Sequence, residues 1–180
     1  MIKYLFMAFL LMPVVAVANP YQVDYEASQI QFSGTHAGNE FTGVFNDWDA
    51  DINFNTQNTD KSFANVTLSV ASAHTGNAMY DGTLPSADWF NVGNYPTASF
   101  KSTSFQKSND GYNVIGELTI RDVTIPMTFN FKLNGENPII MTANLPINRL
   151  KFNIGKDSDG NAEWVSEIIN IDMTLHAKKI

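Results

Sequence analysis

Three aspartates, Asp47, Asp49 and Asp51, alternate along the chain and concentrate negative charge in one short segment. Carboxylates are ligands that calcium prefers, so a metal site is the first chemistry to consider. On a strand these side chains would share one face about 6.7 Å apart. That spacing is too wide for one calcium ion, whose ligands lie about 2.3–2.6 Å from the metal. We therefore interpret the three aspartates as a solvated outer face.

A second acidic segment, Asp157-Ser158-Asp159-Gly160-Asn161, is similar to a calcium-binding loop. In an EF-hand loop the invariant glycine is the sixth residue, and a glutamate at the twelfth position closes the site. Here the glycine is the fourth residue, and Glu163 comes too early to close a site. We expect an ordinary loop at this position.

The remaining residues that could do chemistry show no catalytic pattern. His36, His74 and His176 lack the H-E-x-x-H spacing or any other metal-ligand spacing. The chain has no Cys, which excludes disulfides, a thiol nucleophile and Cys-type zinc sites. Neither a G-x-S-x-G elbow nor a glycine-rich phosphate loop occurs. We therefore predict no catalytic residue, no metal and no cofactor, and we predict that the protein is not an enzyme.

The charge balance limits the partners. The 180 residues include 11 Lys+Arg and 18 Asp+Glu, a formal net charge of −7. An acidic chain is a poor ligand for nucleic acid and for anionic membrane surfaces. The only arginines, Arg121 and Arg149, both follow predicted strands. We interpret each as a structural partner of a carboxylate or of backbone carbonyls, with a contact to a ligand headgroup as the alternative.

The first 18 residues differ from the rest. Lys3 is followed by an apolar stretch from Tyr4 to Val17, which closes with an A-x-A end at Ala18. A basic start, a short apolar run and this end are typical of a cleaved secretory signal peptide. We expect residues 1–18 to be the signal peptide and residues 19–180 the single mature domain. The predicted location is the periplasm, if the source is a Gram-negative bacterium.

The mature chain alternates apolar and polar residues almost throughout. This period of two is the pattern of strands with one buried and one wet face. The clearest run has six apolar residues at alternate positions between Val123 and Leu133. Similar runs cover 66–70, 112–120, 139–147 and 169–177. The pattern predicts an all-β protein.

Turn residues separate these runs. Asn109-Asp110-Gly111 and Asn134-Gly135 are typical of hairpin turns that need a positive φ. Between Phe41 and Phe54 the apolar positions change from odd to even, so we expect a bulge near Asn46-Asp47.

About eight strands joined mostly by short turns match a sandwich or a barrel. The long strands favour an eight-stranded antiparallel up-and-down barrel, which leaves no free edge. One short helical insertion is expected between two strands, within Gly76 to Pro96, beginning near Ser86-Ala87-Asp88. The interior of such a barrel is either filled by side chains or holds one small ligand.

Several short motifs occur along the chain in a specific order. The most specific is Leu84-Pro85-Ser86-Ala87-Asp88-Trp89-Phe90, followed by Tyr95-Pro96. The others are Ser28-Gln29-Ile30-Gln31-Phe32, Ala73-His74-Thr75, Gly116-Glu117-Leu118-Thr119-Ile120-Arg121, Val123-Thr124-Ile125-Pro126 and Ile147-Asn148-Arg149. Through these motifs the chain resembles the YceI-like family of secreted polyisoprenoid-binding proteins, over essentially all of 19–180.

The resemblance implies a lipocalin-like antiparallel barrel whose elongated apolar cavity holds an isoprenoid chain, such as a quinone tail, or another long amphiphile. Two positions depart from the family pattern. Asp122 stands where a glycine is usual after the arginine, and Asn153 stands where a glycine is common after Phe152. Both lie in predicted loops, so they bear on loop geometry more than on the barrel.

These observations predict an exported carrier or sequestering protein for a long-chain amphiphilic lipid. A polyisoprenoid or isoprenoid quinone is the leading ligand, and a fatty acid or its amide is the next. Strand parity and the resemblance together predict the lining of the cavity: Phe32, Leu68, Trp89, Phe90, Leu118, Met127, Phe129, Met141, Ile171 and Met173. The segment from Leu84 to Phe90 is either a plug that closes one end of the barrel or a gate beside its mouth.

Two other functions stay open at this point. The first is an enzyme that acts on a lipid or quinone in the same cavity, and the second is a filled barrel with a structural role. A membrane protein that donates or accepts the lipid, and a homodimer through the polar outer face, also stay open as partners.

Overall fold

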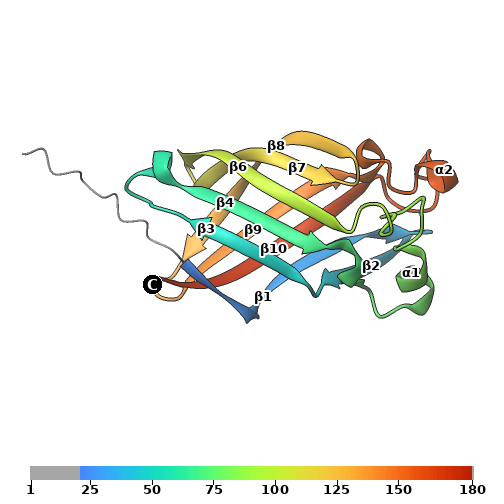
Figure 1. The fold of residues 1–180 in the computed structure, drawn as a ribbon, viewed down its shortest axis with the longest axis horizontal. Coiled ribbons are helices and arrows are strands. Elements are labelled where there is room, and N and C mark those ends of the chain that lie inside the picture. The colour runs from blue at the N-terminus through green and yellow to red at the C-terminus, as the bar shows by residue number, and fades with distance from the viewer. Residues whose placement is uncertain (1–20, 180) are drawn as a thin grey trace, which may run out of the picture.

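The computed structural model describes residues 21–179, which form a sheet of ten antiparallel strands with a few short helical segments (Figure 1). The predicted signal peptide lies outside the described residues. The strands are β1 (Tyr21–His36), β2 (Asn39–Phe45), β3 (Trp48–Asn53), β4 (Phe63–Ser69), β5 (Ala73–His74), β6 (Thr97–Ser108), β7 (Gly111–Ile120), β8 (Val123–Asn134), β9 (Ile139–Asn148) and β10 (Ile168–Lys179). The helical segments are η1 (Thr59–Lys61), η2 (Val70–Ser72), α1 (Ala78–Thr83), η3 (Arg149–Phe152) and α2 (Lys156–Asp159). None of the helices in this part of the chain is long and apolar enough to span a membrane.

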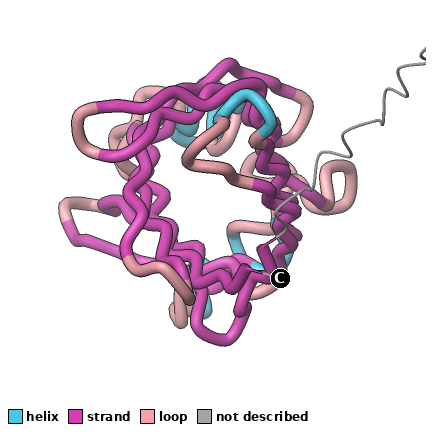
Figure 2. The backbone as a smooth tube through the Cα atoms, turned by 90° about the vertical axis from the view of Figure 1, so that its left-hand side faces the viewer, coloured by secondary structure: helices cyan, strands magenta, loops and turns pink. Residues whose placement is uncertain are grey.

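The strands follow the order β3-β4-β6-β7-β8-β9-β10-β1-β2-β5, and the sheet curls around its own axis (Figure 2). The prediction of eight strands was wrong, because the expected Phe41–Phe54 strand is divided into β2 and β3, and because β5 is an additional strand of two residues. The break between β2 and β3 falls at Asn46 and Asp47, which confirms the irregularity expected there. The break between β4 and β5 is the turn η2. Hydrogen bonds from Ser69 N to Asp47 O (2.9 Å) and from Asn46 N to Ser72 O (3.3 Å) join the two breaks.

A side chain connects β1 and β3, for which no ladder pairing is recorded in the described sheet. The pairing of β1 with β10 shifts register between Asp24 and Gln29, and Tyr25 lies within this irregularity. The Tyr25 hydroxyl donates to Asp49 Oδ1 (2.8 Å) and accepts from Ala50 N (3.2 Å). Asp49 therefore serves an interstrand hydrogen bond on the outer surface, where Asp47 and Asp51 are also exposed.

The long strands alternate polar residues, which face outward, with apolar residues, which face inward. Along β8, the exposed residues all lie on the polar face, and the apolar positions of its first half face inward. The exposed residues are Thr124, Pro126, Thr128, Lys132 and Asn134. Hairpins join β6 to β7 and β8 to β9, and Gly111 (φ 118°) and Gly135 (φ 76°) take the positive φ that the turn residues predict.

The insertion between β5 and β6 contains α1, which begins at the N-cap Asn77. Its Oδ1 accepts from Met79 N (2.9 Å) and Tyr80 N (3.4 Å). The segment Ser86–Asp88 is not the start of a helix, as had been expected, but forms hydrogen-bonded turns. Pro85 separates the two, because it has no N–H to continue the α1 hydrogen-bond pattern.

Candidate functional site

An apolar cavity of about 200 Å³ lies within the curled sheet. Five alternate residues of β10, Ile169, Ile171, Met173, Leu175 and Ala177, line it. At strand rise they cover about 26 Å along β10, so the cavity is elongated. One water-sized group needs roughly 10–15 Å³ of such space. The cavity therefore has room for more than about a dozen groups in a chain.

Nine of the ten residues predicted from the sequence line this cavity: Phe32, Leu68, Trp89, Phe90, Leu118, Phe129, Met141, Ile171 and Met173. Met127 does not line it, and its prediction as a lining residue was wrong. Met127 packs instead against the buried core around Ile120 and Leu145. Its partner in the ladder is Gly116, and the Phe100 ring lies over that glycine and fills the inner face at this level.

Other lining residues were missed. Ile30, Ile52, Val66 and Phe131 alternate on their strands with polar residues, so parity alone could have found them. The lining also includes Leu84, Arg149, Ile154 and Val165, which lie outside the strands. No periodic signal marks these residues, because loops reach the cavity through tertiary contacts.

The interior is open and not filled. Ile169, Ile171 and Met173 point inward yet are only half-buried, because their side chains face the cavity. Two glycines let aromatic rings lie close to the wall. The Phe32 ring lies against Gly43 and the Phe100 ring against Gly116, where an added Cβ would collide with each ring.

The lining is almost entirely apolar. Its polar side-chain atoms belong to Ser99, Tyr21, Trp89 and Arg149. Burial raises the pKa of the Tyr21 phenol. Among the described residues, no carboxylate, histidine or lysine lines the cavity. Desolvation of an apolar chain is the chemistry that this wall offers.

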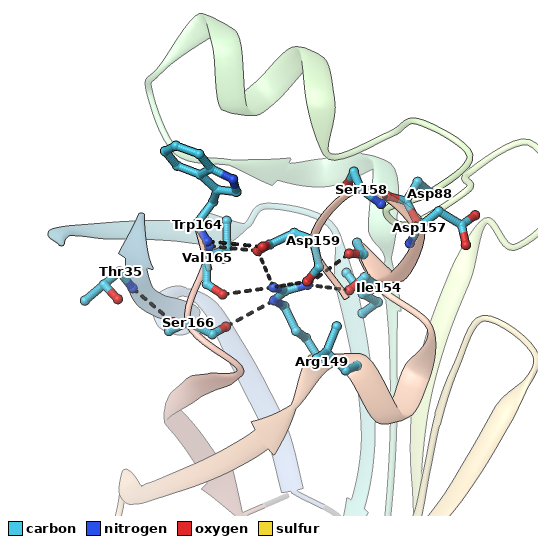
Figure 3. A network of polar contacts seen from close by, with 12 residues as sticks. Thr35, Asp88, Arg149, Ile154, Asp157, Ser158, Asp159, Trp164, Val165 and Ser166 are labelled. Atoms are coloured by element: carbon cyan, nitrogen blue, oxygen red, sulfur yellow. Dashed lines mark hydrogen bonds and ion pairs between the residues drawn. The ribbon is translucent and has the colours of Figure 1, made fainter. Parts of the chain in front are cut away.

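Arg149 closes one end of the cavity and is fully buried, with 1% of its surface exposed. Its Nη2 pairs with Asp159 Oδ2 (2.6 Å) and also donates to Val165 O (2.9 Å). Its Nη1 donates to Ile154 O (2.8 Å), and its Nε donates to Ser166 O (3.1 Å). Figure 3 shows this network around the guanidinium. Arg149 is therefore the structural partner that the sequence suggested.

Asp159 completes the network from the segment that is similar to a calcium loop. Its carboxylate accepts from Val165 N (2.9 Å) and Trp164 N (3.1 Å) as well as from Arg149. Burial opposes ionisation of Asp159, but these N–H groups and the guanidinium outweigh it and hold the pKa below its usual range. All of these hydrogen bonds of the Asp159 carboxylate stabilise the loop between α2 and β10.

The segment Leu84–Phe90 is fastened over the same end. Asp88 accepts from Asp157 N (2.9 Å) and Ser158 N (3.0 Å), and Gly155 N donates to Asp88 O (2.7 Å). Arg121 Nη1 donates to the carbonyls of Asp88 and Trp89 (both 3.1 Å). These contacts favour the interpretation of this segment as a plug.

Replacing Asp88 by Asn should loosen the plug. Burial opposes ionisation of Asp88, but hydrogen bonds from Ser158 and Asp157 outweigh it and lower its pKa. A lowered pKa stabilises the fold above the unfolded-state value of about 3.9 and stops doing so as pH falls through the folded-state value. We expect Asp88→Asn to cost about 1 kcal/mol at pH 7, allowing for solvent screening. Urea unfolding at pH 7 and near pH 3 checks this, since the difference between variant and wild type should shrink at the lower pH. A difference that is equal at both pH values would contradict it.

Residues 21–177 match the YceI-like domain. The chain belongs to the YceI-like family. A UPF0312 protein of Yersinia enterocolitica is 34% identical in an alignment of 167 positions that covers 87% of this chain and 87% of that protein.

Solved structures show the same YceI-like fold. BcnA of Burkholderia cenocepacia superposes with a TM-score of 0.82 at 26% identity, covering 86% of this chain and 99% of that one. A polyisoprenoid binding domain from Saccharophagus degradans, implicated in plant cell wall breakdown, has a TM-score of 0.65 at 16% identity. The match covers 90% of this chain and 99% of that domain. The second likeness concerns the fold alone.

The two departures from the YceI-like pattern have a local explanation. In the β7–β8 turn the positive φ falls on Arg121 (55°), and Asp122 is not among the residues with positive φ in the described chain. A glycine is therefore not needed at Asp122. Asn153 does take a left-handed conformation (φ 57°), which asparagine tolerates better than most residues.

Proposed function

We propose that this protein is exported and carries or sequesters a long-chain amphiphilic lipid inside its cavity. The observation that carries the proposal is the elongated apolar cavity between the plug and the far end of β10. Each buried methylene contributes about 0.8 kcal/mol, so a dozen contribute roughly 10 kcal/mol before the costs of association. Micromolar binding corresponds to about 8 kcal/mol after those costs, so the chain must bury its length in the cavity to reach it.

A polyisoprenoid or isoprenoid quinone is the ligand class that we favour, and a fatty acid or amide is the next. The name of the Saccharophagus degradans domain supports the first class. The signal-like residues 1–18 support export to the periplasm. The acidic composition favours transfer through a membrane protein donor or acceptor over adsorption to an anionic membrane.

Protein purified from its native host under mild conditions should retain its lipid. Native mass spectrometry and lipid extraction are expected to find one long-chain species at near-equimolar amount. Lipid-stripped protein should then rebind a prenol or quinone with a long tail. The proposal fails if the native protein carries no such species and the stripped protein takes up neither probe. Fractionation of the host cells tests export separately, because a protein that stays in the cytoplasm would remove that part alone.

A further inference from the structure

A smaller pocket of about 180 Å³ opens beside α1 and meets the cavity. The two spaces share five lining residues, Phe32, Phe41, Leu84, Trp89 and Val165. Two of these five, Leu84 and Trp89, belong to the plug segment, so a ligand that occupies both spaces passes beside the plug.

The wall of the pocket that faces away from the cavity carries polar groups. His36 comes from β1, Thr75 precedes α1, and Tyr80 and Thr83 belong to α1. His36 Nδ1 lies 2.9 Å from the Tyr80 hydroxyl, and the two rings meet edge to face. Both residues are half-buried, and both line the pocket.

A count of protons shows what this pair can do. A neutral histidine has one N–H and tyrosine has one O–H, and their mutual hydrogen bond uses one of these two protons. If tyrosine donates to Nδ1, then Nε2–H is free to donate. If Nδ1–H donates, then the tyrosine O–H is free. In either tautomer the pair offers one donor to a third group.

The main cavity offers few donors, which are single groups on Ser99, Tyr21 and Trp89 in an otherwise apolar wall. Each of the three guanidinium nitrogens of Arg149 already donates to the protein, to Ser166, Ile154 or Asp159 among others. A polar headgroup placed against the apolar wall would lose most of its hydrogen bonds to water, which costs free energy. The headgroup is therefore better placed in the pocket beside α1.

The charge beside the pocket selects among headgroups. Asp81 accepts from Thr75 N and Oγ1 (both 2.7 Å) and pairs with His74 Nδ1 (2.8 Å). The hydrogen bonds from Thr75 hold the pKa of Asp81 below its usual range, so this carboxyl is ionised at neutral pH. A negative charge that contacts the pocket wall disfavours an anionic headgroup.

We propose that the pocket between β1 and α1 is the headgroup site, where the His36–Tyr80 pair donates a hydrogen bond to a neutral carbonyl oxygen of the ligand. This inference rests on the proposed lipid-binding function and adds the headgroup chemistry and its partners.

The test compares two probes that share a chain length, hexadecanamide and hexadecane, on lipid-stripped protein. Trp89 lines both spaces, so its fluorescence can follow binding of either probe. The variant that removes the free donor, His36→Leu if it is Nε2–H or Tyr80→Phe if it is the tyrosine O–H, should weaken hexadecanamide binding about tenfold, as expected for a lost hydrogen bond of about 1.4 kcal/mol. The double variant should lose little more than that single variant, because the pair supplies one free donor. Hexadecane binding should change less than about twofold in all three.

Tyr95→Phe is the matched control, since it makes the same chemical change at a residue outside both spaces. It should leave both affinities unchanged. If Tyr80→Phe and His36→Leu weaken both probes equally, or weaken neither, the headgroup site is wrong while lipid binding stands. If wild-type protein binds neither probe, the proposed function fails as well.

Discussion

The Arg149→Met variant is expected to lose about 3–5 kcal/mol of its free energy of unfolding, because removing one partner of a buried ion pair leaves the other charge uncompensated. Asp159 is 7% exposed and would keep its carboxylate in the interior. The carbonyls of Ile154, Val165 and Ser166 would lose their donor at the same time. Urea denaturation followed by circular dichroism measures the loss.

Asp159→Asn added to Arg149→Met is the control for this interpretation. The second change removes the uncompensated charge, so the double variant should be more stable than Arg149→Met alone. If the single variant unfolds within about 1 kcal/mol of wild type, the ion pair does not hold this end of the fold.

The same pair predicts a dependence on pH. The pKa of Asp159 is lowered in the folded state, so its contribution is complete above the unfolded-state value of about 3.9 and is lost as pH falls through the folded-state value. Wild type should therefore lose stability below about pH 4. Asp159→Asn should lose less over the same range.

The Ile171→Trp variant is expected to reduce binding of a long-chain lipid at least about a hundredfold, because the larger ring takes space that the chain needs. Ile171 lines the middle of the cavity from β10. Ring atoms that enter an open cavity gain apolar contacts, so the ligand-free variant should keep the thermal stability of stripped wild type. Loss of binding together with retained stability is the combined result that identifies a ligand cavity.

Ile168→Trp provides the matched control on the same strand. Ile168 is 45% exposed and does not line the cavity, so its replacement should leave lipid binding unchanged. Equal binding by the Ile171→Trp variant and wild type would show that the ligand lies elsewhere.

Strand parity predicted part of the wall of the cavity, because an alternating strand has only one face that can point inward. It placed Ile171 and Met173 correctly and failed at Met127, where a ring from a neighbouring strand covers Gly116. Parity predicts which face of a strand a residue occupies. Whether that residue reaches the cavity also depends on side chains of other strands, such as Phe100, which lies two strands away from Met127.

Strand number and the headgroup pocket were harder to predict. The break at Asn46-Asp47 divides one expected strand, and β5, which follows η2, has only two residues and shows no alternation. His36 and Tyr80 lie 44 residues apart, and α1 brings them together. A single sequence read alone contains no periodic signal for such a contact.

Gly43 and Gly116 affect which ligands fit, because together they set the width of the cavity. Each lets a phenyl ring, that of Phe32 or of Phe100, lie back against the wall. A methyl group at Gly43 would push the Phe32 ring toward the axis and narrow the passage, although Gly43 does not line it. At Gly116 an added methyl group would also meet the carbonyl oxygen of Lys101, so the backbone would have to shift there. The cavity can thus be changed to prefer slimmer ligands by a substitution at Gly43, which does not touch the ligand.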